Sequence, residues 1–335
     1  MKKSLSLLLA LVMVLSLMAF GPAASAEDAH EPIVLEFSQT ATQQEHHGAC
    51  WGDFAEYVME RCPWITINVH YGSELYDDST FCEAIMRGNV EMGITAPGYI
   101  GEFAPELSIF AAPYIFDNLD QMNAVLNGEI GQQIYDQVAE ETGVRLLGAI
   151  YQGRRTINLR EDKKITCRAD LDGVLLRVPG GDSWMNMGYA LGCEPTKMAL
   201  SEVYLALQTG AVDGQDNPLQ GTMNYKFGEV TKSITMTDHM LAVVFPCIEE
   251  EIWQTFDDET KQVFMDAFQI AYDKDLDEYV SEEADLIQQF RDMGLTVYDD
   301  VDNSTLAKEV WEYIWANNDK FGYDKEMYDL VKSAA

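Results

Sequence analysis

One stretch decides the fold, and it covers residues 260–293, which read TKQVFMDAFQIAYDKDLDEYVSEEADLIQQFRDM. These 34 residues contain neither Gly nor Pro. Three acids (Asp257, Asp258 and Glu259) precede them, where negative charge stabilises the start of a helix. An unbroken helix of this length would extend about 50 Å, which exceeds the width of one lobe of ~150 residues. The helix either breaks near 273–277 or lies across two lobes, and we favour the second interpretation.

Short apolar runs alternate with helical patterns through the rest of the chain. Strands are expected at 33–37, 65–70, 90–94, 144–151, 155–159, 175–178, 212–215 and 240–247, and helices at 48–61, 78–87, 119–142, 183–191 and 200–209. This alternation is typical of βαβ units with a mostly parallel sheet. Because the pattern begins again after 151, we expect an α/β protein with two lobes of similar build.

The composition of the chain excludes several classes of protein and of binding partner. The chain has 335 residues, is 47% hydrophobic and carries a formal net charge of −34. A large core excludes a disordered acidic protein, and the negative charge argues against nucleic acid and anionic lipid as partners. A small molecule or another protein remains.

The first 26 residues predict a cleavable signal peptide. Lys2 and Lys3 precede an apolar run at 5–20, and Ala-Ser-Ala at 24–26 is typical of a cleavage site. No Cys stands near this site to carry a lipid, and no later stretch is long and apolar enough to span a bilayer. We expect an exported, periplasmic protein that is not membrane-anchored.

Six cysteines leave two interpretations open. They are Cys50, Cys62, Cys82, Cys167, Cys193 and Cys247. Export permits disulfides, but the wide spacings contain no metal or redox motif, and a buried Cys often acts as a small hydrophobic residue.

Catalytic signatures are absent from the sequence. We find no G-x-S-x-G, H-E-x-x-H, Walker A or G-x-G-x-x-G motif. His46 and His47 are the only adjacent histidines. They could bind a metal, but an ordinary pair at a helix entry is the better interpretation. The sequence therefore gives an enzyme no support.

Basic residues cluster where the second lobe is expected to start. Seven of the 22 Lys and Arg residues are Arg154, Arg155, Arg160, Lys163, Lys164, Arg168 and Arg177. This cluster indicates either an anion-binding cleft or a solvated basic face. Arg177 interrupts the apolar strand 175–178, which favours an exposed edge or a bound anion. A guanidinium can hold a carboxylate through two parallel hydrogen bonds.

Two motifs resemble a known family. Residues 169–179 are similar to its D-L-x-G-x-x-x-R-V-P motif, and 201–218, SEVYLALQTGAVDGQDNP, resembles its longest signature. Both belong to the DctP-type solute-binding proteins of TRAP (tripartite ATP-independent periplasmic) transporters. Weaker similarities at 72–75, 83–88, 103–106 and 112–116 extend the resemblance over nearly the whole chain.

The resemblance implies a two-lobed periplasmic-binding-protein fold with a hinge cleft and a long helix crossing both lobes. It implies lobe I at 27–152 with 243–282, and lobe II at 153–242 with 283–335. Such a receptor closes on a small organic acid and delivers it to the membrane subunits of a TRAP permease. It is not an enzyme.

The resemblance also implies a binding site. Arg177 would pair with the ligand carboxylate, Arg155 of the G-x-R element 153–155 would assist in preference to Arg154, and Asn217 would contact the same carboxylate. Pocket positions also fall on Thr40, Asp78 and Tyr99, each of which could instead be structural.

Departures from the family pattern limit the ligand. Asp216-Asn217 replaces the Glu-Trp of members that hold a metal, so no metal or cofactor is expected. Pro97-Gly98 replaces polar residues of sialate-binding members, so sialate is not expected. A C4-dicarboxylate, a sugar acid, an aromatic acid and a keto acid all stay open. The alternative functions are a receptor for an ABC importer or a signalling system and, with less support, a secreted enzyme on this scaffold.

Overall fold

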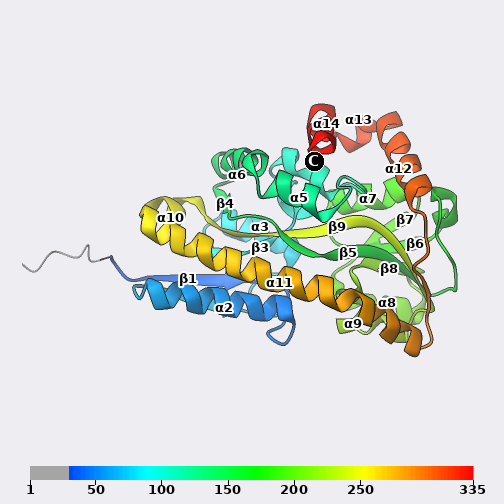
Figure 1. Ribbon diagram of the computed structural model, residues 1–335, viewed down its shortest axis with the longest axis horizontal. Helices are drawn as coiled ribbons and strands as arrows, with labels where there is room; N and C mark the ends of the chain where they lie inside the picture. The colour runs from blue at the N-terminus through cyan, green and yellow to red at the C-terminus, as the bar shows by residue number, and fades with distance from the viewer. Residues whose placement is uncertain (1–29, 335) are drawn as a thin grey trace, which may run out of the picture. The chain divides into compact units, whose positions relative to one another are not determined.

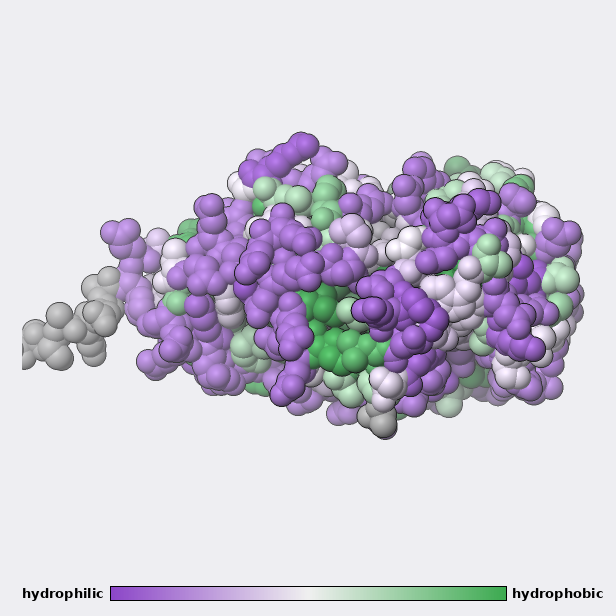
Figure 2. All heavy atoms as spheres, turned by 90° about the horizontal axis from the view of Figure 1, so that it is seen from above, coloured by the Kyte–Doolittle hydropathy of each residue, from purple (hydrophilic) through white to green (hydrophobic). Residues whose placement is uncertain are grey.

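The computed structural model describes residues 30–334, so the predicted signal peptide at 1–26 lies outside the described residues. Within this range, no helix combines the length and apolar character that crossing a bilayer requires. Hydrophilic residues cover most of the face drawn in Figure 2, as the many acidic side chains predict.

The centre of the fold is a mixed sheet in the order β2-β1-β3-β9-β5-β8-β6-β7, with β4 and β10 also paired to β9 (Figure 1). The strands are β1 Ile33–Ser38, β2 Ile65–His70, β3 Met92–Thr95, β4 Val144–Leu146, β5 Ile150–Leu159, β6 Leu175–Val178, β7 Glu194–Lys197, β8 Gly214–Asn217, β9 Ser233–Glu249 and β10 Thr296–Tyr298.

The expected parallel sheet is found only in part. β1 pairs with β3, and β6 pairs with β7 and β8, all in parallel as βαβ units require. The long strands β5 and β9, however, run antiparallel to each other, and β9 is antiparallel to β3 and β4. β9 pairs with β3 near its end and with β10 near its start. It therefore joins two α/β halves, one around β1–β3 and one around β6–β8.

Helices cover this sheet. They are α2 His46–Arg61, α3 Asp78–Met86, α4 Pro97–Ile100, α5 Leu119–Leu126, α6 Glu129–Thr142, α7 Asp182–Leu191, α8 Val203–Thr209, α9 Leu219–Asn224, α10 Glu250–Thr255, α11 Asp258–Asp292, α12 Ser304–Ala316, α13 Asn318–Phe321 and α14 Lys325–Ser333, with short 3-10 helices at Pro105–Ala111, Arg168–Leu171, Leu200–Glu202 and Phe227–Glu229.

The long helix is unbroken, as predicted. α11 has 35 residues, and the Asp257 side chain caps its start by accepting a hydrogen bond from the Thr260 backbone N–H at 2.7 Å. Its first part packs on α2, where Phe264 lies 5.8 Å from Phe54 between ring centres. Its last part packs on α9 and β10, where Phe290 joins the apolar cluster of the second half (Figure 1). The helix therefore crosses both halves.

Two expected elements are interrupted. The single helix predicted over 119–142 is two helices, because Asn127 ends α5 and Gly128 precedes α6. The strand predicted over 144–151 is split between β4 and β5. Gly148 lies between them with a φ of 154°, and a Cβ there would come within 2.3 Å of the Phe268 ring.

All six cysteines lie in the described range, and each is a free thiol. Cys167 is partly exposed and the other five are buried. This arrangement agrees with the interpretation as small hydrophobic residues.

Candidate functional site

All six predicted ligand-binding residues line one cavity of about 1090 Å³. The second half contributes three of them from strand positions near the sheet centre, and the first half contributes three from segments that follow β1, begin α3 and form α4. They are Arg155, Arg177 and Asn217 on one side, and Thr40, Asp78 and Tyr99 on the other. A cleft at strand ends between two α/β halves is a usual place for a small ligand.

Arg177 is a buried cation with one unused donor. β6 lies between β7 and β8, so the side chain is only 2% exposed. Its Nε and Nη2 donate to the Met198 carbonyl at 3.0 and 2.7 Å, whereas Nη1 is buried and has no hydrogen-bond partner among residues 30–334. Burial lowers the pKa of Arg177 to about 10, so the group stays charged at neutral pH. The charges of Asp216 and Asp78 act on Arg177 from nearby, but no carboxylate in the described part of the chain forms an ion pair with it. A buried polar group without a partner is costly, and an anion in the cleft that accepts from Nη1 would remove that cost.

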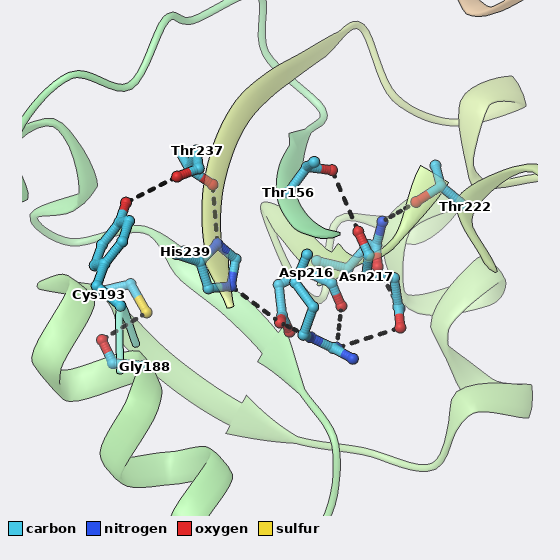
Figure 3. Close-up of polar contacts among 11 residues, drawn as sticks. Thr156, Gly188, Cys193, Asp216, Asn217, Thr222, Thr237 and His239 are labelled. Carbon is cyan, nitrogen blue, oxygen red and sulfur yellow. Dashed lines mark hydrogen bonds and ion pairs between the residues drawn. The ribbon is translucent and has the colours of Figure 1, made fainter. Parts of the chain in front are cut away.

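Arg155 is held in place by neighbouring polar groups. Its Nε donates to Asp216 Oδ2 at 2.6 Å, and its Nη2 donates to the Asp216 carbonyl at 2.7 Å and to Asn217 Oδ1 at 3.2 Å. Figure 3 shows Asp216 also facing His239, whose Nε2 lies 3.4 Å from Oδ2, and Thr237 bonding the other ring nitrogen. Burial favours a higher pKa for Asp216, but the charge of Arg155 and the hydrogen bonds with His239 and Arg155 outweigh it and lower the pKa.

Arg154 lies on the opposite side of β5 from Arg155, because side chains alternate along a strand. Its Nη1 lies 3.1 Å from Asp238 Oδ2, and its Nε lies 3.9 Å from Glu283. It lines a separate cavity of about 860 Å³. Of the two arginines in the G-x-R element, Arg155 therefore faces the candidate site.

The first half of the molecule lines one wall of the cleft with side chains that can accept hydrogen bonds. The Thr40 hydroxyl donates a hydrogen bond to Asp78, and burial raises the pKa of Asp78. The Gln39 Oε1 atom is buried and unpartnered within the described chain. Tyr99 borders the same wall, and burial raises its pKa as well. The cleft is therefore cationic on one side and rich in hydrogen-bond acceptors on the other.

Sequence reasoning missed Trp184, which also lines the cleft. It lies in the first turn of α7, and its ring centre is 4.8 Å from the Arg155 guanidinium carbon and 6.2 Å from the Tyr99 ring centre. Its position soon after the R-V-P segment was the available signal. The apolar pattern of 183–191 predicts only a helix there.

The histidine pair has a shared partner. His47 Nδ1 lies 2.6 Å from Asp275 Oδ2, and His46 Nε2 lies 3.3 Å from Asp275 Oδ1. This contact joins α2 to α11. Across residues 30–334, no group of three or more His, Cys, Asp or Glu side chains is arranged to hold a metal ion.

Comparison with known proteins identifies the family. The model of the bacterial extracellular solute-binding proteins, family 7 (DctP), matches residues 37–318. A solute-binding protein from Roseobacter denitrificans is 34% identical over 203 residues, which are 61% of this chain and 62% of that protein. Its structure with bound L-galactonate has a TM-score of 0.80, 27% identity, and covers 91% of this chain and 99% of its own. The sialic acid-binding periplasmic protein SiaP from Vibrio cholerae is 30% identical over 70% of this chain and 72% of its own.

A second solved structure agrees over the full fold. It is a TRAP periplasmic solute-binding protein from Roseobacter denitrificans with bound 3-deoxy-D-manno-oct-2-ulosonic acid (KDO). Its TM-score is 0.85, with 31% identity, and it covers 91% of this chain and 100% of that one. The two-lobed fold, the cleft and the family match lead to one conclusion: the chain belongs to family 7 of the bacterial extracellular solute-binding proteins, the DctP family of TRAP solute receptors.

Proposed function

We propose that this chain is the extracytoplasmic receptor of a TRAP transporter, which captures a small organic acid by its carboxylate and delivers it to the membrane permease. The family is one of solute-binding receptors, not enzymes. The observation that carries the proposal is the unpaired, buried Nη1 atom of Arg177 at the cleft. Export through the signal peptide at 1–26 would bring the receptor to the periplasm, where its relatives act.

Capture begins with the carboxylate on Arg177. Hydrogen bonds between charged groups are about twice as strong as neutral ones, and Arg155 and Asn217 add contacts beside it. The lobes (27–152 with 243–282, and 153–242 with 283–335) then close and exclude water. The acid favours closure only by its higher affinity for the closed state. Salt screens the net charge of −34 beyond ~8–10 Å, so short-range pairing with the arginines dominates.

Among the open ligand classes, we propose a sugar acid with one carboxylate. Two relatives were solved with KDO and with L-galactonate. The acceptors Gln39 and Asp78 on the wall opposite the arginines suit ligand hydroxyl groups. The second carboxylate of a dicarboxylate would instead approach Asp78, where burial already disfavours negative charge.

Calorimetry on the mature chain tests the proposal. The titrated acids are L-galactonate, KDO, sialate, succinate and benzoate. We expect L-galactonate or KDO to bind most tightly, and sialate, which the sequence does not favour, to bind less tightly. Arg177→Ala should weaken this binding by about 2–5 kcal/mol, as expected when one partner of a buried charge pair is removed. Arg154→Ala is the matched control, because that arginine faces another cavity. Unchanged affinity in Arg177→Ala, or an equal loss in Arg154→Ala, would contradict the proposal.

A further inference from the structure

Trp184 presents a second unused donor in the same cleft. Its side chain is 5% exposed, and Nε1 has no hydrogen-bond partner in the part of the chain that the structure describes. An indole N–H can only donate, and a buried donor without an acceptor carries a desolvation cost. An acceptor that arrives with a ligand would remove this cost.

The indole lies next to the proposed carboxylate site. Its ring is 4.8 Å from the guanidinium carbon of Arg155, within the range of a cation–π contact. Two side-chain nitrogens of Arg155 are occupied by Asp216 and Asn217. The indole therefore packs on an arginine that cannot easily move away. When the carboxylate of a ligand binds near Arg155 and Arg177, the ligand atoms next to that carboxylate lie close to Trp184.

Gly98 makes room for this arrangement. A Cβ at position 98 would lie 2.5 Å from Nε1 and 2.7 Å from Cε2 of Trp184, closer than any real contact allows. The backbone N–H of Asp182, at the start of α7, also donates to Glu102 Oε1 at 3.0 Å. The segment 97–102 of the first half thus holds the start of α7, and the missing side chain at Gly98 lets the backbone of this segment pack directly against the indole nitrogen.

We propose that Trp184 is a specificity-determining residue whose Nε1 donates to the oxygen on carbon 2 of the ligand, and that Gly98 allows the first half to pack this closely on the indole. The inference rests on the proposed function, since it takes the carboxylate to lie on the arginines. Carbon 2 carries the oxygen nearest to that carboxylate. KDO and L-galactonate, bound by two relatives, both have an oxygen there. The receptor therefore prefers 2-hydroxy and 2-keto acids over 2-deoxy acids.

A four-way calorimetric cycle tests the inference, with L-galactonate and its 2-deoxy analogue titrated into wild type and Trp184→Phe. Phe keeps a ring on Arg155 and fits beside Gly98, but it has no N–H. We expect wild type to bind L-galactonate more tightly than its 2-deoxy analogue. Trp184→Phe should reduce the affinity for L-galactonate about two- to tenfold and leave the affinity for the analogue almost unchanged. Equal losses for both acids would overturn the inference. Trp315→Phe, which is outside the cleft, is the control and should not change either affinity.

A spectroscopic readout separates this role from a structural one. The ¹⁵N indole resonance of Trp184 is assigned by its absence in Trp184→Phe. We expect it to shift downfield when the wild type is saturated with any of the titrated acids that binds and has an oxygen on carbon 2. An unshifted resonance in a saturated receptor would overturn the inference. Loss of binding in Arg177→Ala together with unchanged selectivity in Trp184→Phe would leave the proposed function standing and remove only this inference. Unchanged binding in Arg177→Ala would remove the proposed function itself.

Discussion

Arg155 and Asp216 form an ion pair that is almost fully shielded from water. We expect Asp216→Asn to lower the free energy of unfolding by about 3–5 kcal/mol, because it leaves a buried cation without its counter-charge. Urea denaturation at neutral pH measures this loss. The exposed pair of Asp300 and Lys164 is the matched control, and Asp300→Asn should cost at most about 1 kcal/mol. Similar losses in both variants would mean that Asp216 does not support Arg155 as described.

At this scale the motifs predict much of the site. The R-V-P motif indicates Arg177, and the long signature indicates Asn217, and both line the cleft. Arg155 lines the cleft and Arg154 lines the second cavity, because alternate strand residues face opposite sides. That Arg155 contacts the ligand stays a prediction. Trp184 was missed because an apolar residue in a helix pattern is usually core, although its position soon after the R-V-P segment offered a signal. Its surroundings include the backbone of Gly98, which is distant in sequence and approaches the indole closely because it has no side chain.

At the scale of elements, α11 and α2 are joined by Asp275, which contacts both His46 and His47. Burial lowers the pKa of His46, but the ion pair with Asp275, whose Oδ1 lies 3.3 Å from Nε2, outweighs it and raises the pKa above 6.5. Glu278 and Glu282 also face His46 and act in the same direction. Burial raises the pKa of Asp275, but the two histidines outweigh it and lower the pKa below 3.8.

The sign of the pH effect follows from these directions. A raised His46 pKa stabilises the fold fully below pH 6.5, and this contribution is lost as pH rises through the folded value. A lowered Asp275 pKa stabilises above pH 3.8, and this contribution is lost as pH falls. The cluster therefore contributes most between these two values.

We expect Asp275→Asn to destabilise the chain more at pH 5.5 than at pH 8, as measured by urea denaturation at both pH values. His70 is paired with Glu36, and its pKa is also raised. Because His70 is present in both wild type and Asp275→Asn, its contribution cancels in the difference between their free energies of unfolding. If Asp275→Asn lowers the free energy of unfolding by the same amount at pH 5.5 and at pH 8, the pH-dependent role of the cluster of His46, His47 and Asp275 is contradicted.

Helices were more predictable than the sheet. The Gly- and Pro-free pattern of α11 depends on local preferences, and these were enough to predict its length and its path. The pairing of β9 with partners in both halves depends on contacts that are distant in sequence, so its 17 residues were predicted only at 240–247. The break at Gly128 was missed because one glycine in a helical pattern is often tolerated.

For the whole molecule, two α/β halves share β5, β9 and α11, and the cleft between them concentrates two buried arginines in a strongly acidic chain. The resemblance predicted this architecture because members of the family that the two motifs indicate share it, although both motifs fall within the second half. The ligand was not predictable from these motifs, because any carboxylate would satisfy the same arginine.

The most direct measurement is a crystal structure of the chain grown with L-galactonate. We predict one carboxylate oxygen within about 3.2 Å of Arg177 Nη1, with side chains of both halves contacting the acid. An acid bound beside Arg154, or anywhere else that leaves Arg177 Nη1 unpaired, would contradict the central claim.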